Sequence, residues 1–191
     1  VQFKRYSGLA VASPQSSLFL HYVDHLYLFL ASLKPDYRAG VVLRGYFFDY
    51  GWNLGRWLKG HFPEIRVEDP RDSDFFSAIQ NTSLIVVLNN STTLLQALDS
   101  GAPTLLTFRQ RDWPLRASAR PHFEGLERAG IYVESAQEAA RTANSIMAQP
   151  GQWWADAARR ESVRSFCAQY LRRQENAEGE WARFFEAAIN P

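Results

Sequence analysis

The sequence contains a single cysteine, Cys167, and no run of apolar residues long enough to span a bilayer. One cysteine excludes an internal disulfide and favours a reducing compartment. A transmembrane helix needs roughly 18 or more consecutive apolar residues, so no membrane-spanning segment is predicted. These two absences together predict a cytoplasmic protein.

An excess of charge of one sign is also missing, because the formal net charge is +1 and no long run of basic residues occurs. A nucleic-acid partner would require a clustered basic surface, so none is predicted. The chain begins at Val1 without an initiator methionine or a signal peptide, which predicts a fragment of a longer protein.

Apolar runs alternate with segments of helical periodicity along the first 150 residues. The predicted strands are 40–46, 64–68, 83–88, 103–108 and 131–134. The predicted helices are 15–33, 54–61, 72–80, 91–101, 115–129 and 135–148, the last opened by a capping box at Ser135 and Glu138. This order predicts an α/β fold with a parallel sheet covered by helices on both faces. Residues 1–150 are predicted as one Rossmann-like nucleotide-sugar-binding domain. The C-terminal helices over 151–191 are predicted to pack either back on this domain or towards a missing N-terminal half.

Ligands of open parallel sheets bind beyond the carboxyl ends of the strands, so the residues that follow each strand are the first candidates. After the most apolar strand come Asn89, Asn90, Ser91, Thr92 and Thr93. The unpaired N–H groups of the helix that starts there predict a phosphate site. The alternative is that these hydroxyl residues are ordinary helix caps. The glycines and lysine of a P-loop are missing.

Arg44 lies near the end of an otherwise apolar strand, where a guanidinium requires an anionic partner. A ligand phosphate is one candidate partner, and a carboxylate on a neighbouring loop is the other. Tyr50, Trp52 and Asn53 follow, and they either stack on a base or sugar or close the end of the sheet. Trp113 and Arg116 belong to a basic, aromatic loop after a later strand, whose alternative role is a solvated surface.

Histidines give no clear catalytic signal in the sequence. His21 and His25 are four residues apart on a predicted helix, but no third metal ligand follows them, so packing or surface roles are predicted. His122 and Glu124 do not share a helical face. No metal site, cofactor or general base is therefore assigned from the sequence.

Four blocks of sequence together resemble a family of sugar transferases encoded in bacterial surface-polysaccharide gene clusters. They read DYGWN…RW…HFP (49–63), SLIVVLNNSTTLLQALDSGAPTLLTF (83–108), WPLRASARPHFEGLERAGI (113–131) and QWW…FCAQYLRR…EWARFF (152–185). The central block is also similar to the donor-binding half of GT-B glycosyltransferases. The resemblance covers most of the chain, from about residue 40 to residue 189.

This resemblance implies the C-terminal, Rossmann-like half of a GT-B enzyme that binds a nucleotide-activated sugar. Asn90–Thr93 match the loop and helix that hold the donor phosphates, and Gln96 stands where the family usually has a glutamate. The resemblance implies a CMP-activated acidic sugar, such as Kdo or a nonulosonic acid, as one donor. It also implies a glycan acceptor held by a preceding N-terminal domain, and either free cytoplasmic location or peripheral attachment to the inner membrane.

The sequence therefore predicts a glycosyltransferase domain. Arg44, Asn90, Ser91, Thr92 and Thr93 would bind the donor phosphates; the base and sugar pocket would comprise Tyr50, Trp52, Asn53, Gln96, Trp113 and Arg116. One alternative is a nucleotide-sugar epimerase or CDP-polyol phosphotransferase of the same fold. The other is a non-catalytic nucleotide-binding or interaction module. Aromatic residues crowd the last helices, and part of this apolar surface is expected to be exposed.

Overall fold

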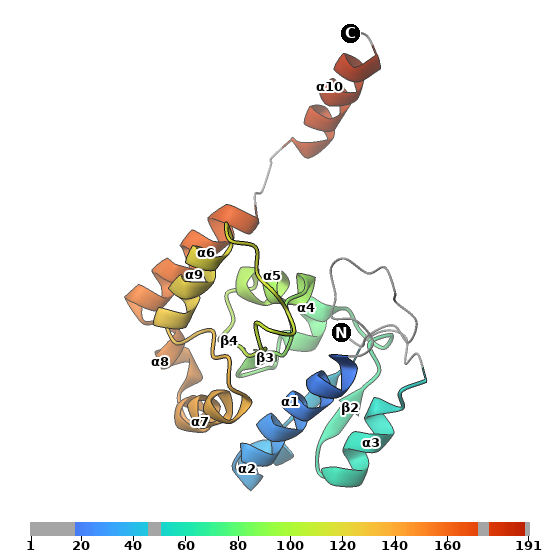
Figure 1. Cartoon of the computed structure of the whole chain (residues 1–191), viewed down its shortest axis with the longest axis vertical. Coiled ribbons are helices and arrows are strands. Elements are labelled where there is room, and N and C mark those ends of the chain that lie inside the picture. Colours follow the sequence, from blue (N-terminus) through green and yellow to red (C-terminus); the bar gives the residue numbers. More distant parts are fainter. Residues whose placement is uncertain (1–17, 46–50, 172–175, 190–191) are drawn as a thin grey trace.

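The computed structural model describes residues 18–45, 51–171 and 176–189. Its helices are α1 (Phe19–Ser32), α2 (Pro35–Ala39), α3 (Leu54–His61), α4 (Phe75–Ile79), α5 (Thr92–Asp99), α6 (Arg120–Arg128), α7 (Ala136–Ile146), α8 (Pro150–Trp154), α9 (Ala157–Tyr170) and α10 (Ala177–Ile189). Its strands are β1 (Val42–Arg44), β2 (Arg66–Glu68), β3 (Ile85–Val87) and β4 (Thr104–Leu106). Figure 1 shows the order of these elements, and the chain has a mixed α/β architecture.

The strands form two parallel pairs instead of one continuous sheet. β1 pairs with β2 in the register Val42 to Arg66, and β3 pairs with β4 in the register Ile85 to Thr104. The segment predicted as a last strand, 131–134, makes only an isolated parallel bridge between Tyr132 and Leu106. The prediction of a single sheet of longer strands is corrected accordingly, and a complete Rossmann-like GT-B half is not confirmed.

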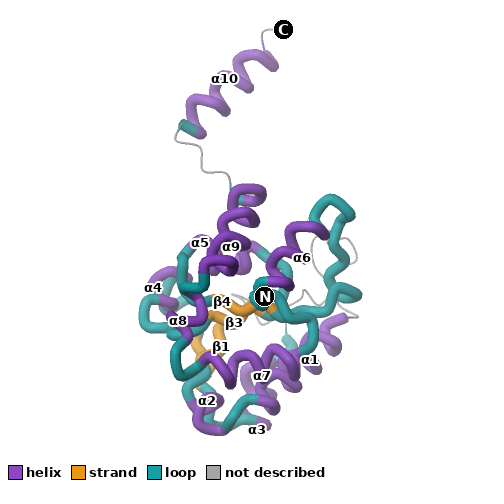
Figure 2. The backbone as a smooth tube through the Cα atoms, turned by 90° about the vertical axis from the view of Figure 1, so that its left-hand side faces the viewer, coloured by secondary structure: helices purple, strands orange, loops and turns teal. Residues whose placement is uncertain are grey.

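Parallel pairing is explained by the helices between the strands, since parallel neighbours need a crossover connection. α3 links β1 to β2, and α5 links β3 to β4. β4 is buried along its whole length, and Ile85 and Val87 of β3 are buried too, in agreement with their apolar sequence. Figure 2 shows the strands in the interior with helices around them.

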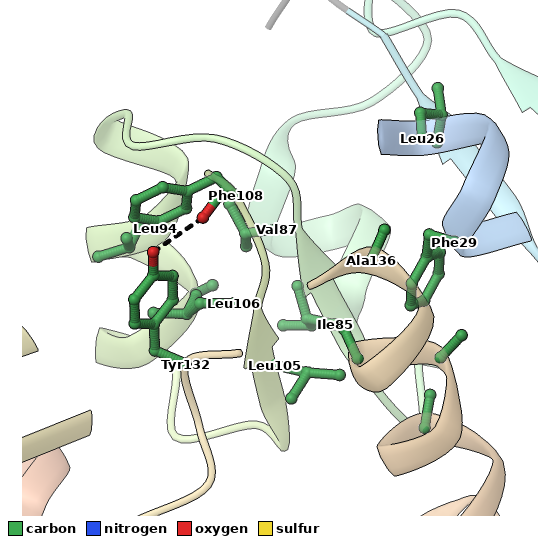
Figure 3. Packing of buried hydrophobic residues seen from close by; sticks show 14 of the residues in the cluster. Leu26, Phe29, Ile85, Val87, Leu94, Leu105, Leu106, Phe108, Tyr132 and Ala136 are labelled. Atoms are coloured by element: carbon green, nitrogen blue, oxygen red, sulfur yellow. Dashed lines mark hydrogen bonds between the residues drawn. The ribbon is translucent and has the colours of Figure 1, made fainter. Parts of the chain in front are cut away.

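The core joins α1, α5 and α7 to the β3–β4 pair, as Figure 3 shows. α1 packs along α7, whose buried face carries small side chains that allow close approach: Ala136, Ala139, Ala140 and Ala143. Asn144 joins the same two helices, because its Nδ2 donates to the Ser32 carbonyl oxygen at 3.0 Å and its Oδ1 accepts from the Lys34 N–H at 2.9 Å. Hence α1 is fixed to an element more than a hundred residues later.

The helices after residue 150 divide into two groups by burial. α9 packs against α6 and α5, with Phe166 edge-on to Phe123 at 5.2 Å. α10 instead exposes Trp181, Phe184 and Phe185, each by more than half of its surface, and Figure 1 draws it apart from the other helices. Exposed apolar surface was expected in this region. The division into a domain over 1–150 and a separate helical tail stays a prediction.

Candidate functional site

The carboxyl edge of the β3–β4 pair is where most of the candidate residues meet. Thr107 N–H donates to the Val87 carbonyl oxygen at 2.9 Å, so the segments that follow β3 and β4 leave the pair side by side. The Tyr132 segment lies on the other side of β4 and runs parallel to it. Three loops therefore start from one edge: 88–91 before α5, 107–119 before α6, and 133–135 before α7.

At the first of these loops, the N-terminus of α5 is not capped by a side chain. Ser91 occupies the N-cap position with extended backbone, but its side chain accepts no hydrogen bond from the helix. Its hydroxyl donates instead to Asn89 Oδ1 at 2.6 Å. Thr92 is exposed and Thr93 half-buried, so both hydroxyls border this helix end. The first-turn N–H groups of α5 thus lack the cap that the alternative interpretation assigned to Ser91.

Asn89 belongs to the predicted stretch after the strand but not to the five residues predicted to bind the donor phosphates. Only 4% of its surface is exposed, and its Oδ1 accepts the Ser91 hydroxyl. Its Nδ2 group has no hydrogen-bond partner within the described ranges. A buried amide NH₂ group without an acceptor is costly, by about 1–3 kcal/mol, and such groups often mark functional positions. The sequence does not reveal whether a polar residue after a strand is buried, so no local signal distinguished Asn89 from its neighbours.

Arg44 lies at the end of the other strand pair and makes several bonds within the chain. Its Nη1 donates to Glu68 Oε2 at 3.2 Å and to Ser73 Oγ at 3.0 Å, and its Nη2 donates to the Pro70 carbonyl oxygen at 3.0 Å. Nη2 also bonds the Ser73 carbonyl oxygen. Of the two partners predicted for Arg44, a ligand phosphate or a carboxylate of the chain, the structure thus supplies a carboxylate. A phosphate role for Arg44 stays a prediction, which the geometry favours less than the structural role.

The segment after β1 is only partly described, because Tyr50 lies outside the described residues. Trp52 stacks on Phe19 with ring centroids 3.9 Å apart, so one face of its ring is covered by the start of α1. Asn53 precedes α3 in the left-handed conformation, with φ of 51°. A base-stacking role for Trp52 stays a prediction.

The remaining pocket candidates are spread over the β3–β4 edge. Trp113 is buried and lines a small pocket with Leu88, so it lies where the two loops leave the sheet. Gln96 is half-buried within α5, one turn beyond Thr92, and Arg116 is exposed. Their roles at a base or sugar stay predictions.

Two histidines of α1 point at the loop that follows β4. Both contacts are to residues more than eighty positions later. His25 is buried, with 5% of its surface exposed, and its Nε2 lies 2.8 Å from Thr107 Oγ1. Burial, followed by the positive charge of Arg109, lowers the pKa of His25 from 6.5 to about 4. His21 is one helical turn earlier, and its Nδ1 donates to Asp112 Oδ1 at 3.0 Å.

Asp112 connects His21 to the basic residues of its own loop. Arg109 Nε donates to Asp112 Oδ2 at 2.8 Å, and its Nη2 bonds the His21 carbonyl oxygen. Arg109 also lies 3.6 Å from Asp24, and Arg111 lies 3.7 Å from Asp112. The structure thus gives His21 and His25 polar partners, whereas packing or surface roles were predicted. Their partners lie 91 and 82 residues away, so sequence spacing could not reveal them.

Two hollows border this cluster. The small one, of about 10 Å³, is lined by His21, His25, Leu88, Asp112 and Trp113 among others. The larger is an open groove of about 670 Å³ between the loop after β4 and the start of α7; its lining includes Arg109, Arg111, Glu134 and Glu138. The first volume suits a single water molecule, and the second lies in the range of small-molecule sites.

No three His, Cys, Asp or Glu side chains of the described residues are grouped as a metal site. No helix in the described part of the chain is long and apolar enough to cross a membrane.

None of the curated proteins or solved structures compared with the chain matches it. The model of one family, described as LIC12162 family transferase, matches residues 1–185. The chain therefore belongs to the LIC12162 family of transferases.

Proposed function

We propose that this transferase domain binds a nucleotide-activated sugar at the carboxyl edge of β3–β4 and serves glycosyl transfer to a bacterial surface glycan. One observation carries the proposal. The N-terminus of α5 has no side-chain cap, and beside it lies the buried Asn89, whose Nδ2 finds no acceptor among the residues that the structure describes. A diphosphate or monophosphate oxygen would satisfy both kinds of donor at once.

The chemistry of a leaving nucleotide fits such a helix end. Glycosyl transfer from a nucleotide sugar places negative charge on the departing phosphate oxygen. The positive end of the α5 dipole, the first-turn N–H groups and the hydroxyls of Thr92 and Thr93 would stabilise that charge. We therefore place the phosphate at Asn89, Asn90, Ser91, Thr92 and Thr93.

The sugar and base need more room than the helix end offers. The groove of about 670 Å³ along the next two loops has that room, and it brings Arg109 and Arg111 to its wall. Exposed guanidinium groups suit an acidic sugar, whose carboxylate they bind in a bidentate manner. Arg111 is exposed, whereas Arg109 is mostly engaged by Asp112. A CMP-linked acidic sugar is for this reason the first donor to test.

Calorimetric titration of the chain with CMP, CDP, UDP and GDP tests the proposal. At least one nucleotide should bind, and Thr92→Ala or Thr93→Ala should weaken its binding about tenfold or more. This magnitude follows from the about 1.5–3 kcal/mol of a hydrogen bond to a charged group. If these hydroxyls only support the helix, the same variants lose about 1 kcal/mol of stability and no affinity.

Thr82→Ala is the matched control. Thr82 is an exposed threonine whose hydroxyl donates to the Ala78 carbonyl oxygen at 3.4 Å, away from the candidate site. Its removal should leave nucleotide affinity unchanged. Absence of binding by all four nucleotides to a chain with a cooperative melting transition would refute the proposal.

A further inference from the structure

His21 and Asp112 form an oriented pair with one nitrogen left open. His21 Nδ1 donates to Asp112 Oδ1 at 3.0 Å, which leaves Nε2 as the unprotonated ring nitrogen. Within the described ranges Nε2 has no hydrogen-bond partner. The His21 side chain is 46% exposed and the Asp112 side chain 8% exposed, so the carboxylate is buried and the imidazole faces outward.

Asp112 is fixed in position before any substrate arrives. Arg109 Nε holds its second oxygen at 2.8 Å, so the two carboxylate oxygens serve two different partners. Arg109 also bonds the His21 carbonyl oxygen, which ties the loop after β4 to the backbone of α1. A buried carboxylate that holds a histidine in one tautomer stabilises the imidazolium formed when Nε2 takes a proton.

The charged groups around His21 come from two elements. α1 contributes Asp24, and the loop after β4 contributes Arg109, Arg111 and Asp112. The positive and negative charges balance in number, so a proton gained by His21 does not join an uncompensated basic cluster. His25, one turn further along α1, is buried against Thr107 and lacks an open ring nitrogen comparable to that of His21.

The pair also lies at the edge where the donor is proposed to bind. His21 and Asp112 line the small pocket together with Leu88, and Leu88 directly precedes Asn89 of the phosphate site. The pocket volume of about 10 Å³ admits a single water molecule but no sugar. A substrate hydroxyl would thus reach Nε2 from the exposed side of the imidazole.

We propose that His21, oriented by Asp112, is the general base of the transfer reaction; this inference rests on the proposed function. The oxygen of the acceptor hydroxyl forms a bond to the anomeric carbon of the donor sugar. The bond from that carbon to the phosphate oxygen breaks, and its electron pair leaves with the nucleotide. The acceptor proton passes to His21 Nε2, and His21 later returns it to solvent.

Donor hydrolysis tests the assignment without a known acceptor, because water then supplies the hydroxyl. The chain is incubated with CMP-, UDP- and GDP-linked sugars, and the released nucleotide is measured by chromatography. His21→Gln and Asp112→Asn should each lower the rate about 10²–10⁴-fold, the usual contribution of a general base. The double variant should be no slower than the slower single variant, because the two residues act as a unit.

The pH profile separates proton transfer from a structural role. A base must be unprotonated, so the wild-type rate should fall towards acidic pH, and this fall should be absent from His21→Gln. His61→Gln is the matched control, since His61 is exposed and its Nδ1 bonds the Trp57 carbonyl oxygen of its own helix at 2.9 Å. It should retain both the rate and the pH profile of the wild type.

Nucleotide affinity, measured on the same variants, distinguishes the two possible failures. Wild-type affinity in His21→Gln together with an unchanged hydrolysis rate would overturn the base assignment and leave the proposed function standing. A wild-type chain that binds a nucleotide but releases none from its sugar conjugate would also overturn the assignment. A wild-type chain that binds no nucleotide at all would overturn the proposed function itself.

Discussion

The buried histidine His25 makes the stability of the fold depend on pH in a defined direction. Its pKa is lowered from the ordinary 6.5 to about 4, chiefly by burial, so the folded chain resists protonation that the unfolded chain accepts. Between these two values the unfolded state binds more protons than the folded state. The free energy of unfolding therefore rises with pH, and the contribution of His25 is lost as pH falls from about 6.5 towards 4.

The size of the effect follows from the same two values. Each unit of separation corresponds to about 1.4 kcal/mol. With an unfolded pKa of 6.5 and a folded pKa of about 4, lowering the pH from 7 to 5 should remove about 2 kcal/mol of stability. No discount for solvent screening is needed, because only 5% of the surface of His25 is exposed. Most aspartates and glutamates are ionised throughout this pH range, so they contribute little to the change.

Urea unfolding followed by tryptophan fluorescence at pH 7 and pH 5 measures this loss. His25→Gln should be less stable than the wild type at pH 7, because the contact with Thr107 is altered, but its stability should change by about 2 kcal/mol less between the two pH values. His61→Gln, at an exposed site, should keep the wild-type dependence. An equal loss of stability in His25→Gln and the wild type would show that the reasoning about burial is wrong.

Two further expectations concern the backbone and the β1–β2 pair. Arg44→Ala should lower the free energy of unfolding by about 1–3 kcal/mol, because its guanidinium bonds Glu68 and two further residues. Nucleotide affinity should stay unchanged. A loss of affinity without a loss of stability would instead support the phosphate role. Gly130→Ala should destabilise the chain by about 1 kcal/mol, since the φ of Gly130 is +70°. Gly60→Ala, in the helix α3, should stabilise the chain by up to about 1 kcal/mol, because an added Cβ meets no atom within 4 Å. Urea midpoints of the two glycine variants test this contrast, and equal signs would contradict it.

The sequence predicted the order of elements well because each element carries its own periodic signal. The N-cap at Ser135 is confirmed: Ser135 Oγ accepts from the Glu138 N–H at 3.4 Å, and α7 begins at Ala136. The strand lengths were overestimated, since apolar character continues beyond the hydrogen-bonded ladder. Phe108 is buried like Leu106, but it lies past the end of β4. An apolar run predicts that its side chains are buried, but it does not predict how far the hydrogen bonds between strands extend.

The candidate site was predictable only where it is local. The loop from Asn90 to Thr93 could be proposed as a phosphate site because strand, hydroxyl residues and helix follow one another in the chain. The pairing of His21 with Asp112 depends on α1 crossing the end of β4, and no spacing rule connects residues 91 positions apart. The alternative partners of Arg44 were stated from the cost of an unpaired charge, but the choice of Glu68 required the register of β1 against β2.

The attachment of α1 to α7 has a consequence for the order of events during synthesis. α1 leaves the ribosome well before α7, since the contact between Lys34 and Asn144 spans 110 positions. Until then α1, whose buried residues include Leu26, Phe29 and Leu30, lacks the α7 surface that packs along it. Such late long-range contacts slow folding and leave the nascent chain open to aggregation. The histidines of α1 also wait for distant partners, because Thr107 and Asp112 follow them by 82 and 91 positions.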